Sequence, residues 1–385
     1  MISDRQYYRK VMLLLFAAGW GANHFSSMLI VYRMKLGLAQ AALGQVFGAY
    51  ALGLVPGLIL AGRVSDRLGR RALVLPAGAG AVAATATLAF GHYGFGVLLA
   101  GRLLYGLAMG CVMSPGSVWV QELSPRALGP RRATLALSAG FGLGPLVSGV
   151  LAEFAPAPLV LPYVTHALVM ALGLAAARSV PETAQLGANL PAPSEKPVVA
   201  PSVGKSEFLL LLGLVPSAPW AFGFPAVAMV VLPVLMRSLV ARPVLYSAFL
   251  VAITLFTGVL VQPLTAHLGR RGDLLGIGLG TLGIGLGAYA VSVRAPSLVY
   301  AVAPLVGAGY GLVMTTGLRQ ASERAPQATR GTVVGIYYVL TYLGFALPFV
   351  HAVAAQHLGD VRTLEVTAGA ALACLVIRAW LTAID

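Results

Sequence analysis

The sequence predicts an all-α membrane protein, with twelve transmembrane helices arranged as two pseudo-symmetric six-helix bundles. Apolar residues make up 58% of the 385 residues and charged residues only 10%, whereas a soluble domain carries about 25% charged residues. Long apolar runs alternate with short polar loops, and a spanning helix needs about 20 apolar residues. The chemistry of one basic loop also recurs, in weaker form, in the second half of the chain, which indicates an internal duplication.

The first half of the chain divides into six apolar segments that are long enough to cross a bilayer. The first segment follows a basic start and contains Trp20, Asn23 and His24. It is therefore too long and too polar for a signal peptide, and we expect it to be retained. The predicted spans are residues 9–33, 40–61, 72–91, 94–122, 131–155 and 158–179.

The second half repeats this pattern after a polar connection. Residues 182–206 contain four prolines with Ser, Glu and Lys, which predicts a flexible linker between bundles at 1–181 and 207–385. The seventh span contains Pro216, Pro219, Pro225 and Pro233, which should break or kink it. The predicted spans are residues 207–235, 243–268, 273–293, 296–321, 330–356 and 362–382.

An internal repeat relates the two halves. The basic loop at residues 62–71 has a worn copy at residues 264–271, again between two apolar runs. Ala266 takes the place of Asp66, so we expect a weaker network around the second copy. Glycines and a methionine of the fourth span also recur in the tenth, where small residues let helices approach closely: Gly106, Gly110, Met113 and Gly116 correspond to Gly307, Gly311, Met314 and Gly317.

The net charge of +14 reflects membrane topology rather than nucleic-acid binding. With the N-terminus inside, most Lys and Arg residues fall on the cytoplasmic side, so both termini should be cytoplasmic. The basic excess also suits contact with anionic lipid headgroups. Cys111 and Cys374 both fall within predicted spans, and the sequence contains no metal-ligand cluster or nucleophile triad. We therefore expect no enzyme activity, no metal and no cofactor.

Four motifs are similar to those of the major facilitator superfamily, in order and spacing along the whole chain. Residues 62–71 resemble its Gly-x-x-x-Asp-Arg-x-Gly-Arg-Arg loop, and residues 101–106 resemble its motif with one membrane arginine. Residues 140–149 resemble the fifth-span motif of the 12-helix drug/proton antiporter branch, with Ser148 replacing a family glycine. Residues 181–183, Pro-Glu-Thr, also fit. The resemblance implies the major facilitator fold.

The resemblance further implies a latch that closes the cytoplasmic side in one state. Asp66 would cap a neighbouring helix start and pair with basic residues, since an anion at a helix N-terminus gains about 0.3–1 kcal/mol. The alternative is a loop that only sets topology. The predicted gate and latch residues are Gly62, Asp66, Arg67, Gly69, Arg70, Arg71, Glu122, Arg126 and Glu182.

Proton coupling is assigned to His24 and Arg102. Burying the charged Arg102 side chain within a membrane span costs free energy, so it should face a partner or the cavity. The resemblance links this arginine to proton coupling. It could instead be a hydrogen-bond hub between the first and fourth spans. His24 can titrate near neutral pH, or stay neutral with a carbonyl or Asn23 as partner. No acid lies near the middle of a span, so coupling could also use His166, Glu122 or Glu153, or be absent.

The predicted cavity is aromatic and neutral, which suits an apolar or cationic organic substrate. Four first-span residues share one helical face, and the others are aromatic or methionine residues of spans 4, 7, 10 and 11. Spans 1, 4, 7 and 10 line the cavity in the superfamily that the chain resembles. About half could instead only pack against neighbours. The predicted lining is Trp20, Asn23, His24, Ser27, Met109, Met113, Trp220, Phe224, Tyr310, Met314, Tyr337 and Tyr338. Span 5 should serve helix packing through Gly140, Gly144, Pro145 and Gly149.

The sequence therefore predicts a secondary active transporter that works by alternating access in the cytoplasmic membrane. We expect a monomer that exports amphiphilic or drug-like compounds in exchange for protons, with lipids and the substrate as its partners and no nucleic acid. Import or facilitated diffusion of a small organic metabolite is the alternative. A receptor or assembly factor on a transporter scaffold is the alternative from another class.

Overall fold

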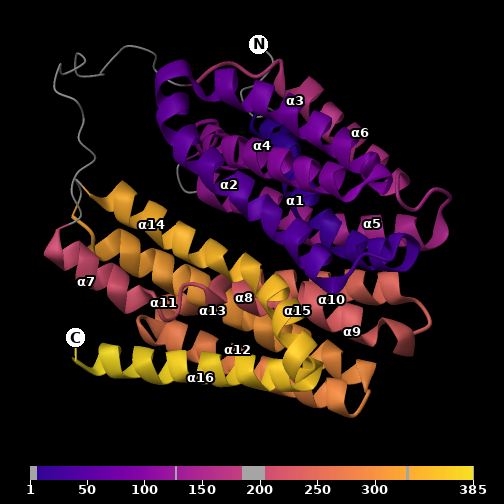
Figure 1. Ribbon diagram of the computed structural model, residues 1–385. Coiled ribbons are helices and arrows are strands. Elements are labelled where there is room, and N and C mark those ends of the chain that lie inside the picture. Colours follow the sequence, from indigo (N-terminus) through magenta and orange to yellow (C-terminus); the bar gives the residue numbers. More distant parts are fainter. Residues whose placement is uncertain (1–6, 126–127, 184–203, 327–328, 385) are drawn as a thin grey trace. The chain divides into compact units, whose positions relative to one another are not determined.

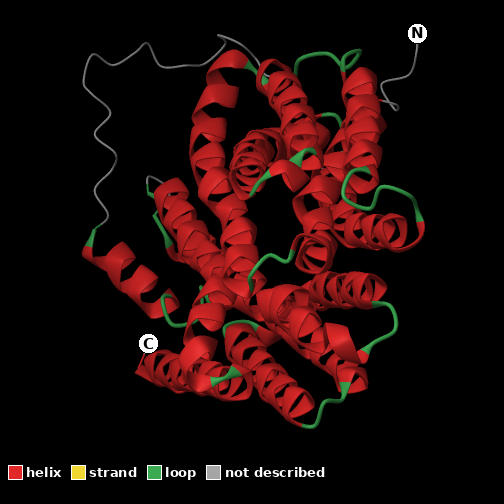
Figure 2. Ribbon diagram, turned by 45° about the vertical axis from the view of Figure 1, so that its right-hand side comes forward, coloured by secondary structure: helices red, strands yellow, loops and turns green. Residues whose placement is uncertain are grey.

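The computed structural model describes residues 7–125, 128–183, 204–326 and 329–384, and every regular element within these ranges is helical (Figures 1 and 2). Within these ranges, eleven helical stretches are long and apolar enough to cross a membrane by length and composition, and Leu161–Ala177 is a shorter apolar helix. Together they match the twelve predicted spans, so the predicted fold class is confirmed. Contacts group the chain into two compact units, residues 1–188 with 242–252, and residues 189–241 with 253–385.

Unit 1 is built around its first helix. The helix α1 packs along α5 and also contacts α4 and α6, and most of its side chains are buried. The helices α2 and α3 both pack on α4. The bounds are α1 Tyr7–Leu36, α2 Gln40–Leu68, α3 Arg70–Ala89, α4 Phe95–Glu122, α5 Gly129–Phe154 and α6 Leu161–Ala177.

Unit 2 has a broken helix at its start. The predicted span 207–235 is interrupted after Leu214 and resumes at Trp220, because Pro216 and Pro219 lie between. A π-helical turn, Val227–Val231, then joins two short helices. The helix α10, Pro243–Val261, begins in unit 1 and ends in unit 2. The bounds of the other helices are α7 Lys205–Leu214, α8 Trp220–Ala226, α9 Leu232–Met236, α11 Thr265–Leu268, α12 Arg271–Ser292, α13 Val299–Arg324, α14 Arg330–Tyr342, α15 Leu347–Leu358 and α16 Asp360–Ile384.

The repeated glycines occupy equivalent close contacts in the two units. A Cβ added at Gly106 or Gly110 in α4 would collide with the α2 backbone. A Cβ added at Gly307 or Gly311 in α13 would collide with the α10 backbone at Thr254 or Gly258. Close approach of helix backbones in lipid depends on such small residues. The sequence repeat therefore corresponds to a repeated helix-packing contact.

Candidate functional site

The start of α3 is capped by a carboxylate from the segment after α6. Gly69 ends α2 with φ of 101° and leaves the first amides of α3 without helical partners. Glu182 accepts hydrogen bonds from the Arg70 amide at 2.9 Å and the Arg71 amide at 2.8 Å. The Arg71 guanidinium donates to the Arg178 carbonyl oxygen at 3.0 Å. A carboxylate at this position stabilises the positive end of the helix dipole.

A second carboxylate joins this network from the end of α4. Glu122 lies 3.5 Å from the Arg70 guanidinium and accepts a hydrogen bond from the Thr183 hydroxyl. The Trp119 indole donates to the Pro181 carbonyl oxygen at 3.1 Å. We name Gly69, Arg70, Arg71, Glu122 and Glu182 the α3-start network. The charged side chains of this network keep contact with solvent and tie α3, α4 and the chain after α6 together.

Only part of the predicted latch lies within the described residues. Arg67 is exposed at the end of α2. The surroundings of Gly62, the side chain of Asp66 and the whole of Arg126 lie outside what the structure describes. The predicted role of Asp66 therefore stays a prediction, while Glu182 is the carboxylate that caps α3.

A buried cluster of imidazoles and phenols lies between α1, α3, α4 and α6. His24 stacks on His166, with ring centroids 5.0 Å apart and planes 25° apart, and meets Tyr163 edge-on. His166 is held by the Thr85 hydroxyl at 2.9 Å and the Ala17 carbonyl oxygen at 3.0 Å. Neither ring nitrogen of His24 has a hydrogen-bond partner among the described residues. Only one of the two stacked imidazoles is therefore fixed by hydrogen bonds.

Arg102 is enclosed by aromatic rings rather than by an acid. Its guanidinium carbon lies 4.4 Å from the Phe25 ring centroid and 4.7 Å from that of Tyr50. Nε donates to the Val46 carbonyl oxygen at 3.4 Å, and Nη1 has no partner in the part of the chain that the structure describes. Cation–π contacts of this kind are worth about 2 kcal/mol or more when desolvated. They stabilise the cation without neutralising its charge.

The helix α5 packs on α1 through the predicted small residues. A Cβ at Gly140 would collide with the α1 backbone at Phe16 and Trp20, and a Cβ at Gly144 would lie 2.6 Å from the Trp20 carbonyl oxygen. Pro145 lies within α5, and its carbonyl oxygen accepts a hydrogen bond from Ser27 at 2.9 Å. The Trp20 indole donates to the Ser148 hydroxyl at 3.4 Å. Trp20 and Ser27 are thus engaged in this helix contact.

The remaining predicted packing and lining residues fall into two groups. Gly149 is buried against Ala248 within unit 1. Met109, Phe224 and Tyr337 are almost fully buried, and the Tyr337 hydroxyl donates to the Val313 carbonyl oxygen at 3.0 Å. The lining residues that keep partial exposure are Asn23, Met113, Trp220, Tyr310, Met314 and Tyr338.

Five aromatic side chains of unit 2 contact one another in a group that we name the aromatic platform. Phe222 is its centre and stacks on Tyr342 with centroids 5.0 Å apart and planes 8° apart. Phe222 also stacks on Tyr310 at 5.9 Å and contacts Phe345 at 4.9 Å. Tyr338 joins through Tyr342 at 6.4 Å, and all members except Tyr342 are partly exposed. The platform carries no charge, and three of its five side chains bear a phenol hydroxyl.

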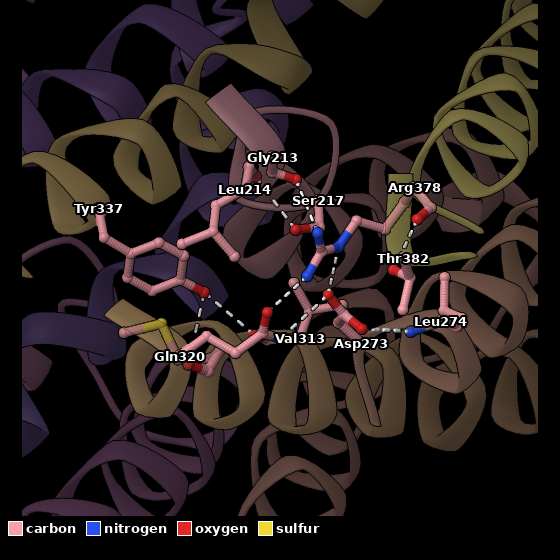
Figure 3. Close-up of polar contacts among 11 residues, drawn as sticks. Gly213, Leu214, Ser217, Asp273, Leu274, Val313, Gln320, Tyr337, Arg378 and Thr382 are labelled. Carbon is pink, nitrogen blue, oxygen red and sulfur yellow. Dashed lines mark hydrogen bonds and ion pairs between the residues drawn. The ribbon is translucent and has the colours of Figure 1, made fainter. Parts of the chain in front are cut away.

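Sequence reasoning missed a buried ion pair in unit 2. Arg378 in α16 donates from Nε to Asp273 in α12 at 2.6 Å, and both side chains are nearly inaccessible. The same guanidinium donates to the Gln320 amide oxygen at 2.7 Å and the Gly213 carbonyl oxygen at 3.0 Å. Figure 3 shows it between these partners from α7, α12 and α13. The available signal was the opposite charge of two residues near the ends of two apolar segments. Charges at such positions are usually interpreted as parts of the loops.

Comparisons with known proteins identify the family. A family model described as the Major Facilitator Superfamily matches residues 11–348. Among solved structures, a peptide transporter POT in complex with sulfate superposes with a TM-score of 0.82 at 15% identity, covering 98% of this chain and 94% of that one. A mutant of the nucleoside transporter NupG gives 0.79 at 11% identity, covering 98% and 100%. At such low identity these structures establish the fold alone.

One curated relative is similar in sequence over a limited stretch. A gallate transporter from Pseudomonas putida is 33% identical over 120 residues, which is 31% of this chain and 26% of that protein. The matched stretch thus spans about a quarter of the relative. Among the described residues, no group of three His, Cys, Asp or Glu side chains is placed to hold a metal ion.

Proposed function

The chain belongs to the major facilitator superfamily, a family of membrane transporters rather than enzymes, and from this premise we propose that it exports amphiphilic organic compounds in exchange for protons. The protein is a multi-pass secondary transporter of small molecules. The proposal adds the substrate class, the direction and the coupling ion. It also places the protein in the cell membrane with both termini cytoplasmic, as the Lys and Arg distribution favours.

The aromatic platform is the observation that carries the substrate class. Phe222, Tyr310, Tyr338 and Phe345 are partly exposed side chains, and the ring contacts that join them involve no charged group. Ring faces attract apolar surface and organic cations, and a cation needs no carboxylate when aromatic faces surround it. A sugar phosphate or an inorganic anion would instead need several basic residues. The platform therefore suits a flat or cationic amphiphile.

Proton coupling is proposed for His24 with His166. The stacked imidazoles are buried, and His24 has no hydrogen-bond partner among the described residues. A proton placed there would be a buried charge without an anion, and Arg102 already supplies one positive charge nearby. Such a charge is costly unless water or an anion reaches it. Protonation would therefore favour a state in which α1 and α6 open this cluster to water.

Alternating access would use the α3-start network on the cytoplasmic side. Its charged groups keep contact with solvent, and each contact contributes only a small free energy, so the network can break and reform. Substrate and proton can shift the balance between states only through their different affinities for each state. The network, the imidazole pair and the platform would supply the gate, the coupling site and part of the substrate site.

The substrate class is tested with a matched pair of tyrosines on α13. We expect cells lacking their own efflux pumps to gain resistance to a panel of toxic cationic and neutral amphiphiles when they express the protein. Tyr310→Ala should abolish this resistance because Tyr310 belongs to the platform. Tyr300→Ala, which changes an exposed tyrosine on the same helix, should leave it intact. Equal loss in both variants, at equal membrane levels, would count against the platform.

The coupling assignment is tested by transport driven with a pH gradient in proteoliposomes. His24→Ala should abolish the pH-driven component of flux and leave substrate exchange across the membrane in place. His92→Ala, which changes a histidine in the turn Gly91–Tyr93, is the control and should behave like the unmodified protein. An unchanged pH dependence in His24→Ala would refute the assignment.

A second candidate is uptake of a small aromatic acid. Arg102 has no acid as partner in the described chain, and its guanidinium lies between two rings. A guanidinium of this kind could receive a carboxylate, and one relative is a gallate transporter. Inward flux of labelled gallate or benzoate that is lost in Arg102→Gln, without resistance to amphiphiles, would favour this candidate over export.

A further inference from the structure

A cavity of about 160 Å³ lies in unit 2 where α12 begins and α13 ends, apart from the platform. Its lining includes Arg270, Thr316, Arg319, Gln320, Glu323 and Arg324. A single water needs only about 10–15 Å³ of such space, so the cavity has room for a larger polyatomic group. Gln320 connects it to the buried ion pair, since its amide oxygen accepts from Arg378 (Figure 3).

The charge of the lining favours an anion. Three arginines face one carboxylate, and that carboxylate, Glu323, is already bonded to Arg319 at 2.8 Å. The nearby Asp273 is paired with Arg378. The helix α12 begins at Arg271, directly after two lining residues, and a helix start also favours negative charge. Arginine forks match the oxygen geometry of phosphate groups.

Thr316 supplies an independent observation. Its side chain lines the cavity and is only 1% exposed, yet its hydroxyl has no hydrogen-bond partner among the described residues. Buried hydroxyls are nearly always hydrogen-bonded, because an unpaired one keeps its full desolvation cost. Gly272 lies beside this hydroxyl, and a Cβ at that position would come within 2.3 Å of the Thr316 oxygen. A bound group with acceptor oxygens would satisfy it.

We propose that this cavity is a binding site for a phosphate group. Thr316 would donate its hydroxyl hydrogen to a phosphate oxygen, and Arg270, Arg319 and Arg324 would neutralise the charge. Basic pockets at helix ends bind phosphate from lipid headgroups, and the same chemistry would hold a free phosphate anion. The site shares no residue with the aromatic platform or the imidazole pair, so the phosphate proposal is tested independently of the export proposal.

The test measures binding of two probes to the purified full-length chain. Inorganic phosphate is titrated in detergent against sodium chloride of equal ionic strength, with the shift in unfolding temperature as readout. The lipid source is tested by comparing unfolding temperatures in phosphatidylcholine nanodiscs with and without phosphatidylglycerol. Stabilisation by inorganic phosphate would identify a free anion as the ligand. Stabilisation by phosphatidylglycerol alone would identify a lipid headgroup.

Variants connect either signal to this cavity. Arg319→Gln should weaken binding of the active probe about tenfold, the effect of losing one charge-assisted hydrogen bond. Thr316→Val, which keeps the side-chain shape, should weaken it by a smaller factor. Glu323→Gln should tighten binding several-fold, a gain that misfolding cannot produce. Arg362→Gln is the matched control, because Arg362 also pairs with an acid one turn away. The proposal is overturned if neither probe stabilises the protein, or if these variants and the control respond alike.

Discussion

The repeated basic loop leads to two different electrostatic arrangements in the two units. In unit 1, residues 69–71 start α3, and their amides are capped by Glu182, a partly exposed residue that follows α6. In unit 2, residues 269–271 start α12, and the acid is Asp273 of the same helix, fully buried against Arg378 of α16. The two similar loops therefore lie in different surroundings, one in a partly exposed network and the other beside a buried ion pair.

The difference in burial sets how each arrangement responds to change. A solvated carboxylate at a helix start contributes a modest free energy, and water replaces its partners when it moves away. A buried ion pair gains little net stability over apolar residues of the same shape, but loss of one partner leaves an uncompensated charge. The α3-start network is thus suited to open and close, whereas Asp273 and Arg378 hold their helices in one arrangement.

The largest expected effect comes from breaking the buried pair. Arg378→Met should lower the free energy of unfolding by about 3–5 kcal/mol, because it leaves Asp273 charged and unpaired and also removes the donors to Gln320 and Gly213. The measurement is denaturant unfolding in detergent followed by tryptophan fluorescence.

Two further variants sharpen this result. Arg362→Met removes an exposed ion pair with Glu365 from the same helix and should cost no more than about 1 kcal/mol. The double variant Asp273→Leu with Arg378→Met removes both charges and should recover much of the lost stability. A double variant as unstable as Arg378→Met alone would contradict the charge explanation.

Much of the fold could be predicted from the sequence. Hydropathy predicts the spans, and the glycine repeat predicts equivalent helix contacts. Four prolines predict a broken or kinked seventh span, and the structure places the interruption before Trp220. Each of these signals is local or periodic, so it can be recognised in the sequence without knowledge of tertiary contacts. The recognition of the superfamily rested on motifs with fixed spacing, and the family model confirms it. The antiporter branch stays a prediction.

The missed contacts are those that join distant residues. Asp273 and Arg378 lie 105 positions apart, and each alone looks like a charge at the end of a span. His24 gave a local polar signal in the first span, but its stacking on His166 depends on how α1 and α6 pack. Glu182 was predicted as a member of the latch network, but its role as the cap of α3 required the structure.

A smaller effect is expected at the cap of α3. Glu182→Gln keeps an oxygen that can accept one amide hydrogen bond but removes the negative charge beside the Arg70 and Arg71 amides. The free energy of unfolding should fall by about 1 kcal/mol, the range for a charge at a helix start. Transport should change more than stability, since the network is proposed to close one state. We would compare unfolding and substrate flux, with Glu365→Gln in unit 2 as the exposed-acid control; equal flux in the two variants would contradict a gating role.

The smallest effect is expected for the outer member of the same network. Glu122 lies 3.5 Å from the Arg70 guanidinium, and both side chains retain solvent contact. Glu122→Gln should therefore cost between 0 and about 1 kcal/mol in low salt. The cost should disappear in molar salt, where charges are screened within about 3 Å, whereas the cost of Arg378→Met should persist because its partners are buried. Unfolding of both variants at low and high salt measures this contrast, and a salt-independent cost for Glu122→Gln would show that the two units do not differ as their burial implies.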